Sequence, residues 1–282
     1  MDPTGERYIP ETMEGRIKVD HLNRYYFAAN IADLSSKTIL DIASGSGYGS
    51  YIISEHAEHV YGVDISQEAI EYSQEHYNKT NLTFIQGDAC KIPLKDRTID
   101  MVISFETIEH TDAQETMISE IKRVLKPDGF LIISSPNKKT YSDEPNYHNP
   151  FHKKELYTNE LVELLHREFK SVILFEQNYH IGSTIYPAQN IECCAPSIVL
   201  RENHRIIHPP MYDIAIAYDE YPRLTIPAVT SYLEDSGQIS ISEAELSSLL
   251  QKERQSLKDK SISWKLGNAI LFPFKKIIKT KK

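Results

Sequence analysis

The sequence predicts an α/β protein built around a mostly parallel sheet. Short apolar runs rich in β-branched residues alternate with helical segments through most of the chain. Such alternation is typical of βαβ units, because two parallel strands need a long crossover connection. A glycine-rich stretch, LDIASGSGYGS at residues 40–50, includes the end of the first apolar run. We therefore expect a ligand at the carboxyl ends of the strands.

The predicted strands and helices follow one another in a regular order. Strands are expected at residues 37–43, 59–65, 82–88, 99–105, 129–135, 171–179 and 211–218. Helices are expected at residues 66–79, 112–126 and 153–169. Ser66 is expected to cap the first helix, and the KPDG stretch at 126–129 to form a turn before the next strand. The late strand is expected to close the sheet.

The composition is that of a globular protein with an acidic balance. The 282 residues carry a formal net charge of −9, with 40% hydrophobic and 25% charged residues. Proteins that bind nucleic acid usually present a basic face, so this balance argues against such a partner. The three cysteines show no disulfide pattern, and neither a signal peptide nor a membrane-spanning run is recognisable. These observations predict a cytoplasmic protein.

Two acidic residues end the strands that follow the glycine-rich stretch. Gly45, Gly47 and Gly49 alternate, which differs from the dinucleotide pattern G-x-G-x-x-G. Asp64 ends the second strand, where a carboxylate can accept hydrogen bonds from both ribose hydroxyls of an adenosyl group. Asp88 ends the third strand, where its carboxylate can accept a hydrogen bond from an adenine amino group. The loop alone would fit a tight turn, but with both acids in order it predicts an adenosyl ligand.

These motifs resemble those of a known family. The series D-x-x-x-G-x-G, VDIS, GDA and RVLKPDG, within residues 5–218, resembles the class I S-adenosylmethionine-dependent methyltransferases. The resemblance implies a Rossmann-like, seven-stranded, mostly parallel sheet with helices on both faces and an antiparallel last strand. It also implies that the S-adenosylmethionine site is lined by Asp41, Gly45, Gly47, Asp64, Asp88 and Ala89, with Phe105 or Glu106 near the methionine portion.

The N-terminal stretch TGERYIPE, residues 4–11, resembles a segment at the start of a bacterial subgroup encoded with polysaccharide enzymes. By this resemblance the stretch would cap the cofactor, with Arg7 and Tyr8 as contacts. The alternative is a poorly ordered terminus.

The stretch FETIEH, residues 105–110, carries candidate catalytic residues. Glu106, Glu109 and His110 would share one face of a helical turn. They could hold a divalent cation such as Mg²⁺ that lowers the pKa of a substrate hydroxyl. The same E-x-x-E-H pattern appears in small-RNA 2′-O-methyltransferases and quinone-pathway O-methyltransferases, where it is associated with magnesium. His148 and His152 are candidate further ligands, and His152 resembles the partner histidine more closely.

Two readings without a metal stay open for these residues. His110 or His152 could act as a general base for a hydroxyl. Glu106 and Glu109, together with these histidines, would position that hydroxyl. The acidic and histidine side chains could also have a structural role only.

The C-terminal part of the chain has a different pattern. No acidic residue follows Asp259, and aromatic and isoleucine residues alternate with lysines. A peripheral, interfacial segment at the inner face of the cytoplasmic membrane fits this pattern, and so does a helix docked on the domain. We divide the chain into an N-terminal cap and helix (1–36), a methyltransferase domain (37–220, with an insertion at about 180–209), a linker (221–239) and a helical basic tail (240–282).

The sequence thus predicts an S-adenosylmethionine-dependent O-methyltransferase. Resemblance at both chain ends to bacterial surface-polysaccharide enzymes suggests a sugar hydroxyl of a glycan, or its precursor, as substrate and a glycosyltransferase as partner. Two alternatives are an O-methyltransferase of a small phenolic or quinone-type substrate and a non-catalytic membrane adaptor with a vestigial fold.

Overall fold

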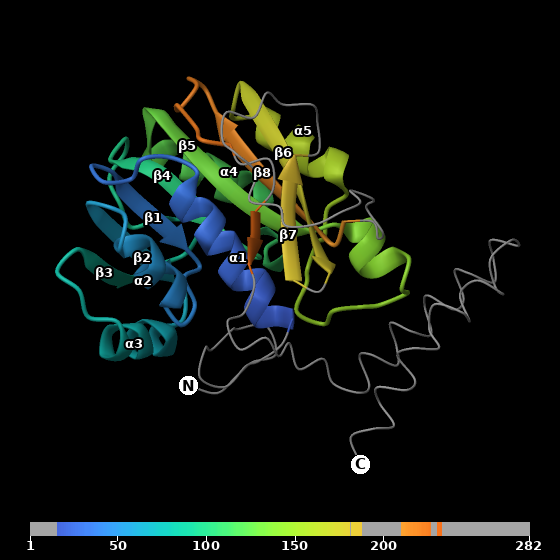
Figure 1. Ribbon diagram of the computed structural model, residues 1–282, viewed down its shortest axis with the longest axis horizontal. Helices are drawn as coiled ribbons and strands as arrows, with labels where there is room; N and C mark the ends of the chain where they lie inside the picture. The colour runs from blue at the N-terminus through green and yellow to red at the C-terminus, as the bar shows by residue number, and fades with distance from the viewer. Residues whose placement is uncertain (1–15, 181, 188–209, 227–229, 233–282) are drawn as a thin grey trace, which may run out of the picture. The chain divides into compact units, whose positions relative to one another are not determined.

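The structure is a computed structural model that describes residues 16–180, 182–187, 210–226 and 230–232 (Figure 1). The predicted cap contacts Arg7 and Tyr8 lie outside the described residues, as does the predicted tail at 240–282.

The described strands form one sheet of nine, in the order β3-β2-β1-β4-β5-β8-β6-β7-β9. Strands β1 to β5 run parallel, and β8 is antiparallel to both of its neighbours, β5 and β6. This arrangement confirms the predicted fold, with β8 as its late antiparallel strand. The strand does not close the sheet as expected, because it lies between β5 and β6. Strands β7 and β9 extend the sheet beyond β6, and β7 lies within the predicted insertion. The strands are β1 (Thr38–Ile42), β2 (His59–Asp64), β3 (Leu82–Gln86), β4 (Ile99–Ser104), β5 (Leu125–Pro136), β6 (Ser171–His180), β7 (Gly182–Pro187), β8 (Tyr212–Tyr218) and β9 (Thr230–Tyr232).

Helices cover both faces of the sheet (Figure 1). Strand β4 is buried along its whole length: Met101 and Ile103 belong to one apolar cluster, and Val102 to the other. The first cluster packs α1 and α2, and the second packs α4 and α5. The helical segments are α1 (Arg16–Asn30), α2 (Tyr48–Ser54), α3 (Gln67–His76), the short turn η1 (Ile108–His110), α4 (Gln114–Val124), the π-helical turn η2 (Lys139–Asp143) and α5 (Thr158–His166).

Two local predictions have different outcomes. The Ser66 cap is confirmed, because its side chain accepts a hydrogen bond from the backbone N–H of Ala69. The turn at 126–129 is instead an irregular part of β5: Ile99 pairs with Leu125, and the next pair already joins Met101 to Phe130. Four residues therefore bulge out of the strand without ending it.

Among the helices of the described part of the chain, none is both long and apolar enough to span a membrane.

Candidate active site

The glycine-rich loop turns sharply between β1 and α2. Gly45 and Gly47 have φ angles of 56° and 84°, which glycine adopts with little strain. A Cβ on Gly47 would also lie 2.6 Å from the Oγ atom of Ser73 and 2.8 Å from the ring of Phe84. The loop thus packs tightly against α3 and β3. At this position glycine serves the turn and its packing.

Asp64 connects the end of β2 to this loop. One of its carboxylate oxygens accepts a hydrogen bond from the N–H of Gly45 at 2.8 Å, and the other accepts one from Ser66 at 2.8 Å. A carboxylate has about four acceptor sites, so both oxygens retain capacity for ribose hydroxyls. The geometry therefore fits the predicted role of Asp64.

Directly after β2 an exposed apolar residue follows Asp64, and the sequence reasoning did not single it out. Ile65 is 68% exposed, although large aliphatic side chains are usually buried. Its carbonyl accepts a hydrogen bond from Gln86, at the end of neighbouring β3. Exposed Asp88 follows two residues later, before half-buried Ala89. An adenine ring could cover Ile65 and donate to Asp88. The signal in the sequence was an apolar residue directly after an acidic strand end.

Asp41 is buried at the end of β1. Its carboxylate accepts hydrogen bonds from Ser50 of α2 at 2.6 Å and from the hydroxyl of Tyr25 of α1 at 3.1 Å. Burial raises the pKa of this carboxyl to about 7, although both hydrogen bonds oppose the shift. Its visible role is to join two helices to the sheet, and its predicted contact with the cofactor stays a prediction.

Arg24 of α1 brings a buried cation to the site, and the sequence analysis missed it. Its Nε atom donates to Gln177 at 2.7 Å, its guanidinium lies 4.4 Å from the ring centre of Tyr212, and its side chain is 1% exposed. Burial opposes the charge, but nearby Glu106 and other groups raise the pKa overall. Among the described residues neither terminal nitrogen has a hydrogen-bond partner, which is rare for buried donors. No periodicity marks this arginine, because its partners come from β6, β8 and the end of β4.

The side chain of Glu106 is not grouped with those of Glu109 and His110. Its φ angle is 49°, which is unusual for a residue other than glycine and interrupts the expected helical turn. Its carboxylate accepts a hydrogen bond from Ser134 at 2.6 Å and lies 3.6 Å from Arg24. The structure therefore does not bring Glu106 to the other candidate ligands. Adjacent Phe105 is 8% exposed and packs edge-on against Tyr25.

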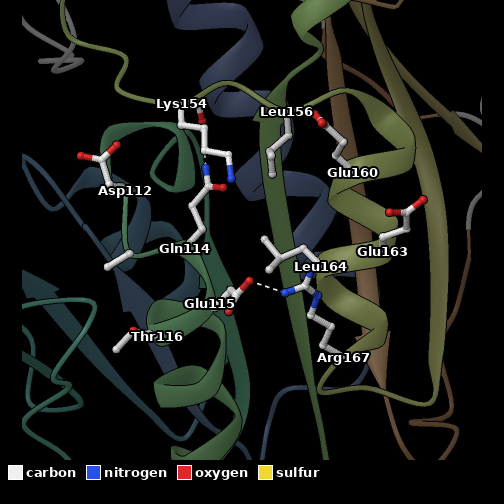
Figure 2. A pocket seen from close by; sticks show the side chains of 11 residues that line it. Asp112, Gln114, Glu115, Thr116, Lys154, Leu156, Glu160, Glu163, Leu164 and Arg167 are labelled. Carbon is white, nitrogen blue, oxygen red and sulfur yellow. Dashed lines mark hydrogen bonds and ion pairs between the residues drawn. The ribbon is translucent and has the colours of Figure 1, made fainter.

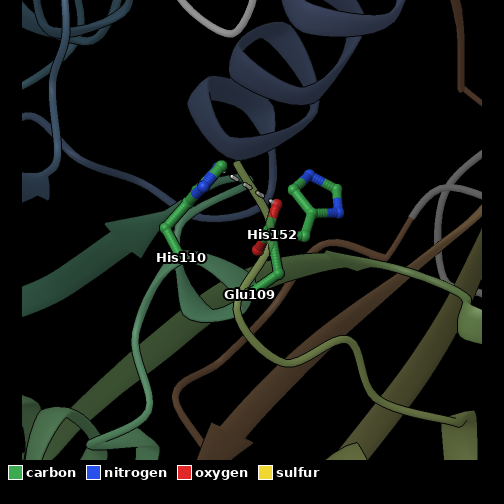
Figure 3. Close-up of side chains that lie close together, drawn as sticks. All are labelled: Glu109, His110 and His152. Atoms are coloured by element: carbon green, nitrogen blue, oxygen red, sulfur yellow. Dashed lines mark ion pairs between the residues drawn. The ribbon is translucent and has the colours of Figure 1, made fainter. Parts of the chain in front are cut away.

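Glu109, His110 and His152 do come together (Figure 3). Each offers one ligand atom, and these atoms lie within 4.8 Å of one another. Glu109 is 1% exposed, and Nδ1 of His110 donates to the carbonyl of Phe151 at 3.1 Å. The donor set of one carboxylate and two imidazoles suits a divalent metal and equally suits proton transfer. His148 is exposed and is not part of this group.

A cavity of about 440 Å³ lies elsewhere, between α4 and α5 (Figure 2). It is lined by side chains of mixed charge, and Glu115 and Arg167 form an ion pair across it. None of the predicted site residues that the structure describes lines this cavity.

Comparison with known proteins gives matches to methyltransferases. Residues 40–133 match the family model described as a methyltransferase domain. A probable S-adenosylmethionine-dependent methyltransferase of Mycolicibacterium smegmatis is 33% identical over 172 residues, 57% of this chain and 62% of that protein. A fatty-acid O-methyltransferase of the same organism is 31% identical over 120 residues, 40% of this chain and 44% of that protein.

Solved structures show the same fold. One described as an S-adenosylmethionine-dependent methyltransferase, possible histamine N-methyltransferase, from Thermotoga maritima has a TM-score of 0.55 at 16% identity. The aligned part covers 72% of this chain and 91% of the Thermotoga maritima chain.

The order of the strands and the helices on both faces are those of the class I methyltransferase fold. The chain spans less than two thirds of the length of the first curated relatives that it matches.

Proposed function

We propose that this protein transfers the methyl group of S-adenosylmethionine to a hydroxyl group. The observation that carries the proposal is the group of Glu109 and His110, which follow β4, with His152, which comes from the loop before α5. The glycine loop follows β1, and Asp64 ends β2. Because β1, β2 and β4 are parallel, all three features lie at the same edge of the sheet. A methyl donor and a hydroxyl activator would meet there.

The described residues fit the methyl donor at both of its ends. Asp64, Ile65 and Asp88 would hold the adenosine, as argued from their acceptor capacity and exposure. The two buried terminal nitrogens of Arg24, which have no hydrogen-bond partner in the described part of the chain, would receive the methionine carboxylate, because an anion fills two parallel N–H groups well.

The chemistry asks mainly for alignment and for removal of one proton. The hydroxyl oxygen attacks the methyl carbon as the carbon–sulfur bond breaks, and the proton passes to an imidazole nitrogen of His110 or His152. A divalent cation held by Glu109, His110 and His152 would lower the pKa of the hydroxyl instead.

Two experiments separate these versions. Methyl transfer is measured from radiolabelled S-adenosylmethionine after treatment with a chelator and again after adding Mg²⁺ or Mn²⁺. Loss and recovery of activity would support the metal, whereas full activity without metal would reject it and leave the imidazole as base. Glu109→Gln should abolish metal-dependent activity, and Glu163→Gln, at an exposed carboxylate of α5, is the matched control.

For the acceptor we propose a sugar hydroxyl of a bacterial surface glycan or its precursor, supported by the resemblance at both chain ends. A lipid acceptor is the second candidate, because a relative is named as a fatty-acid O-methyltransferase. A phenolic or quinone-type acceptor is the third. Mass spectrometry of glycans and lipids from cells with and without the protein distinguishes them, since only the true acceptor loses 14 Da, about the mass of one CH₂ group, per site.

A non-catalytic adaptor would show no donor binding. Calorimetry with S-adenosylhomocysteine tests this, and absence of binding would reject the enzyme proposal altogether.

We also propose peripheral association with the cytoplasmic membrane through the basic segment at 240–282, and a glycosyltransferase partner there. The support is the lysine and aromatic pattern of that segment. The full chain should sediment with vesicles rich in anionic lipid and not with zwitterionic ones. Equal recovery with both would contradict an electrostatic contribution.

A further inference from the structure

His152 lies at the centre of a hydrogen-bonded chain that extends beyond the proposed catalytic group. Its Nδ1 atom lies 2.6 Å from a carboxylate oxygen of Glu155, and both side chains are largely buried, at 5% and 9% exposure. The other oxygen of Glu155 accepts a hydrogen bond from the hydroxyl of Ser142. The ring of Tyr141 stacks on the imidazole, with 5.3 Å between ring centres and 25° between planes. The imidazole is therefore held in place and in plane.

The opposite nitrogen, Nε2, lies 3.0 Å from the amide nitrogen of Asn149. The direction of this amide is set by its other end, because Oδ1 of Asn149 accepts a hydrogen bond from the backbone N–H of Phe151 at 3.0 Å. The amide therefore presents N–H donors to His152. An imidazolium would present a second N–H there, and two donors would face each other.

These contacts fit the tautomer of the ring that carries its proton on Nδ1. That proton is donated to Glu155, and the lone pair of Nε2 accepts from Asn149. The hydrogen bond at one imidazole nitrogen decides which form the other nitrogen takes.

We infer that Glu155 is a positioning residue for His152, which holds its proton on Nδ1 so that Nε2 is the nitrogen that receives a hydroxyl proton or a cation. The inference rests on the proposed function of His152. The amide of Asn149 occupies, at Nε2, the position that a donor hydroxyl of the acceptor would take. When the substrate hydroxyl replaces the Asn149 amide as hydrogen-bond donor, Nε2 of His152 keeps a hydrogen-bond partner.

The test reads the protonated nitrogen directly. The full chain is labelled with ¹⁵N in its histidine rings, without methyl donor, acceptor or metal, and long-range ¹⁵N–¹H spectra are recorded at neutral pH. His152→Gln assigns the signals. We expect a protonated Nδ1 and an unprotonated Nε2 for His152. A proton on Nε2, alone or on both nitrogens, would overturn the inference.

Variants at Glu155 extend the test. Glu155→Leu removes the acceptor and should move the proton to Nε2, whereas Glu155→Gln retains an acceptor oxygen and should keep it on Nδ1. Glu163→Leu, at an exposed carboxylate of α5, is the matched control and should leave the His152 signals unchanged. Unchanged signals in Glu155→Leu would contradict the inference. If that variant does not fold, the wild-type spectrum and Glu155→Gln decide.

The spectra test the positioning role of Glu155, and the enzyme assay tests the proposed function, so each proposal can be rejected independently of the other. Where methyl transfer is observed, Glu155→Leu should lower kcat about 10- to 100-fold, a range typical of partners behind a ligating histidine, with the KM for S-adenosylmethionine unchanged. The expected spectrum without methyl transfer by the wild type would reject the proposed function alone. Methyl transfer with a proton on Nε2 would reject the positioning role alone.

Discussion

Replacing the buried carboxyl of Asp41 by the neutral amide of asparagine should change how stability depends on pH. Asp41 is fully buried at the end of β1, and its pKa is raised from 3.8 to about 7 by burial. Below about pH 4 the carboxyl is protonated in both the folded and the unfolded chain. Between about pH 4 and pH 7 only the folded chain keeps the proton, so this group makes the fold less stable as the pH rises.

The size of this effect follows from the two pKa values. The difference is about three pKa units, and each unit corresponds to about 1.36 kcal/mol, so the full effect is on the order of 4 kcal/mol above pH 7. Domains are stable by only about 5–15 kcal/mol, which makes such a change easy to measure. The asparagine side chain of the variant stays neutral at every pH, and the hydroxyls of Ser50 and Tyr25 can either donate to it or accept from it.

The assay is urea unfolding of the wild type and of Asp41→Asn at several pH values from 4 to 8. The free energy of unfolding of the variant, minus that of the wild type, should rise by about 4 kcal/mol across this window. Other titrating groups cancel in the difference. Asp128→Asn, at an exposed carboxylate, is the matched control and should keep the wild-type dependence. A difference for Asp41→Asn that stays flat within about 1 kcal/mol would refute the reasoning.

Three further predictions concern the loop and the donor. In Gly49→Ala the new Cβ would lie 2.0 Å from the ring of Tyr25. The free energy of unfolding in urea should therefore fall by about 1–3 kcal/mol, and the second change Tyr25→Leu should partly restore it. Equal stability of the wild type and both variants would show that α1 adapts freely. Asp64→Ala should weaken S-adenosylhomocysteine binding in calorimetry on the order of tenfold to a hundredfold, since hydrogen bonds to a charged group are lost, and an unchanged affinity would remove Asp64 from the ribose site. Arg24→Met should weaken the binding of S-adenosylhomocysteine but not that of methylthioadenosine, which lacks the carboxylate. Equal weakening for both ligands would indicate that Arg24 has a structural role only.

The sheet was predictable because its signals are local. Each core strand is a short apolar run between turn or helix signals, and a buried parallel strand such as β4 needs apolar residues toward both faces. The bulge before Phe130 was not predictable as part of a strand. A Cβ on Gly129 would lie 3.0 Å from the carbonyl oxygen of Asp100, and that close approach exists only once β4 and β5 have paired.

The candidate site was predictable in part. The acid at Asp64 follows from its place at a strand end. Helical spacing suggested that Glu106, Glu109 and His110 act together, but that argument assumed a regular helix. The left-handed conformation at Glu106 turns its carboxylate to Ser134 and Arg24, whereas Glu109 and His110 meet His152 from a loop about 40 residues later.

By itself, therefore, the sequence determined the order of strands and helices, the glycine turn and the acidic strand ends, because hydrophobic period, capping and turn chemistry act between near neighbours. Only the tertiary structure decided which polar side chains share a buried space. Arg24 meets Gln177, and Glu155 orients His152 beside Glu109, because the chain must satisfy buried polar groups with whichever partners packing brings near. Those partners come from elements whose separation along the chain carries no periodic signal.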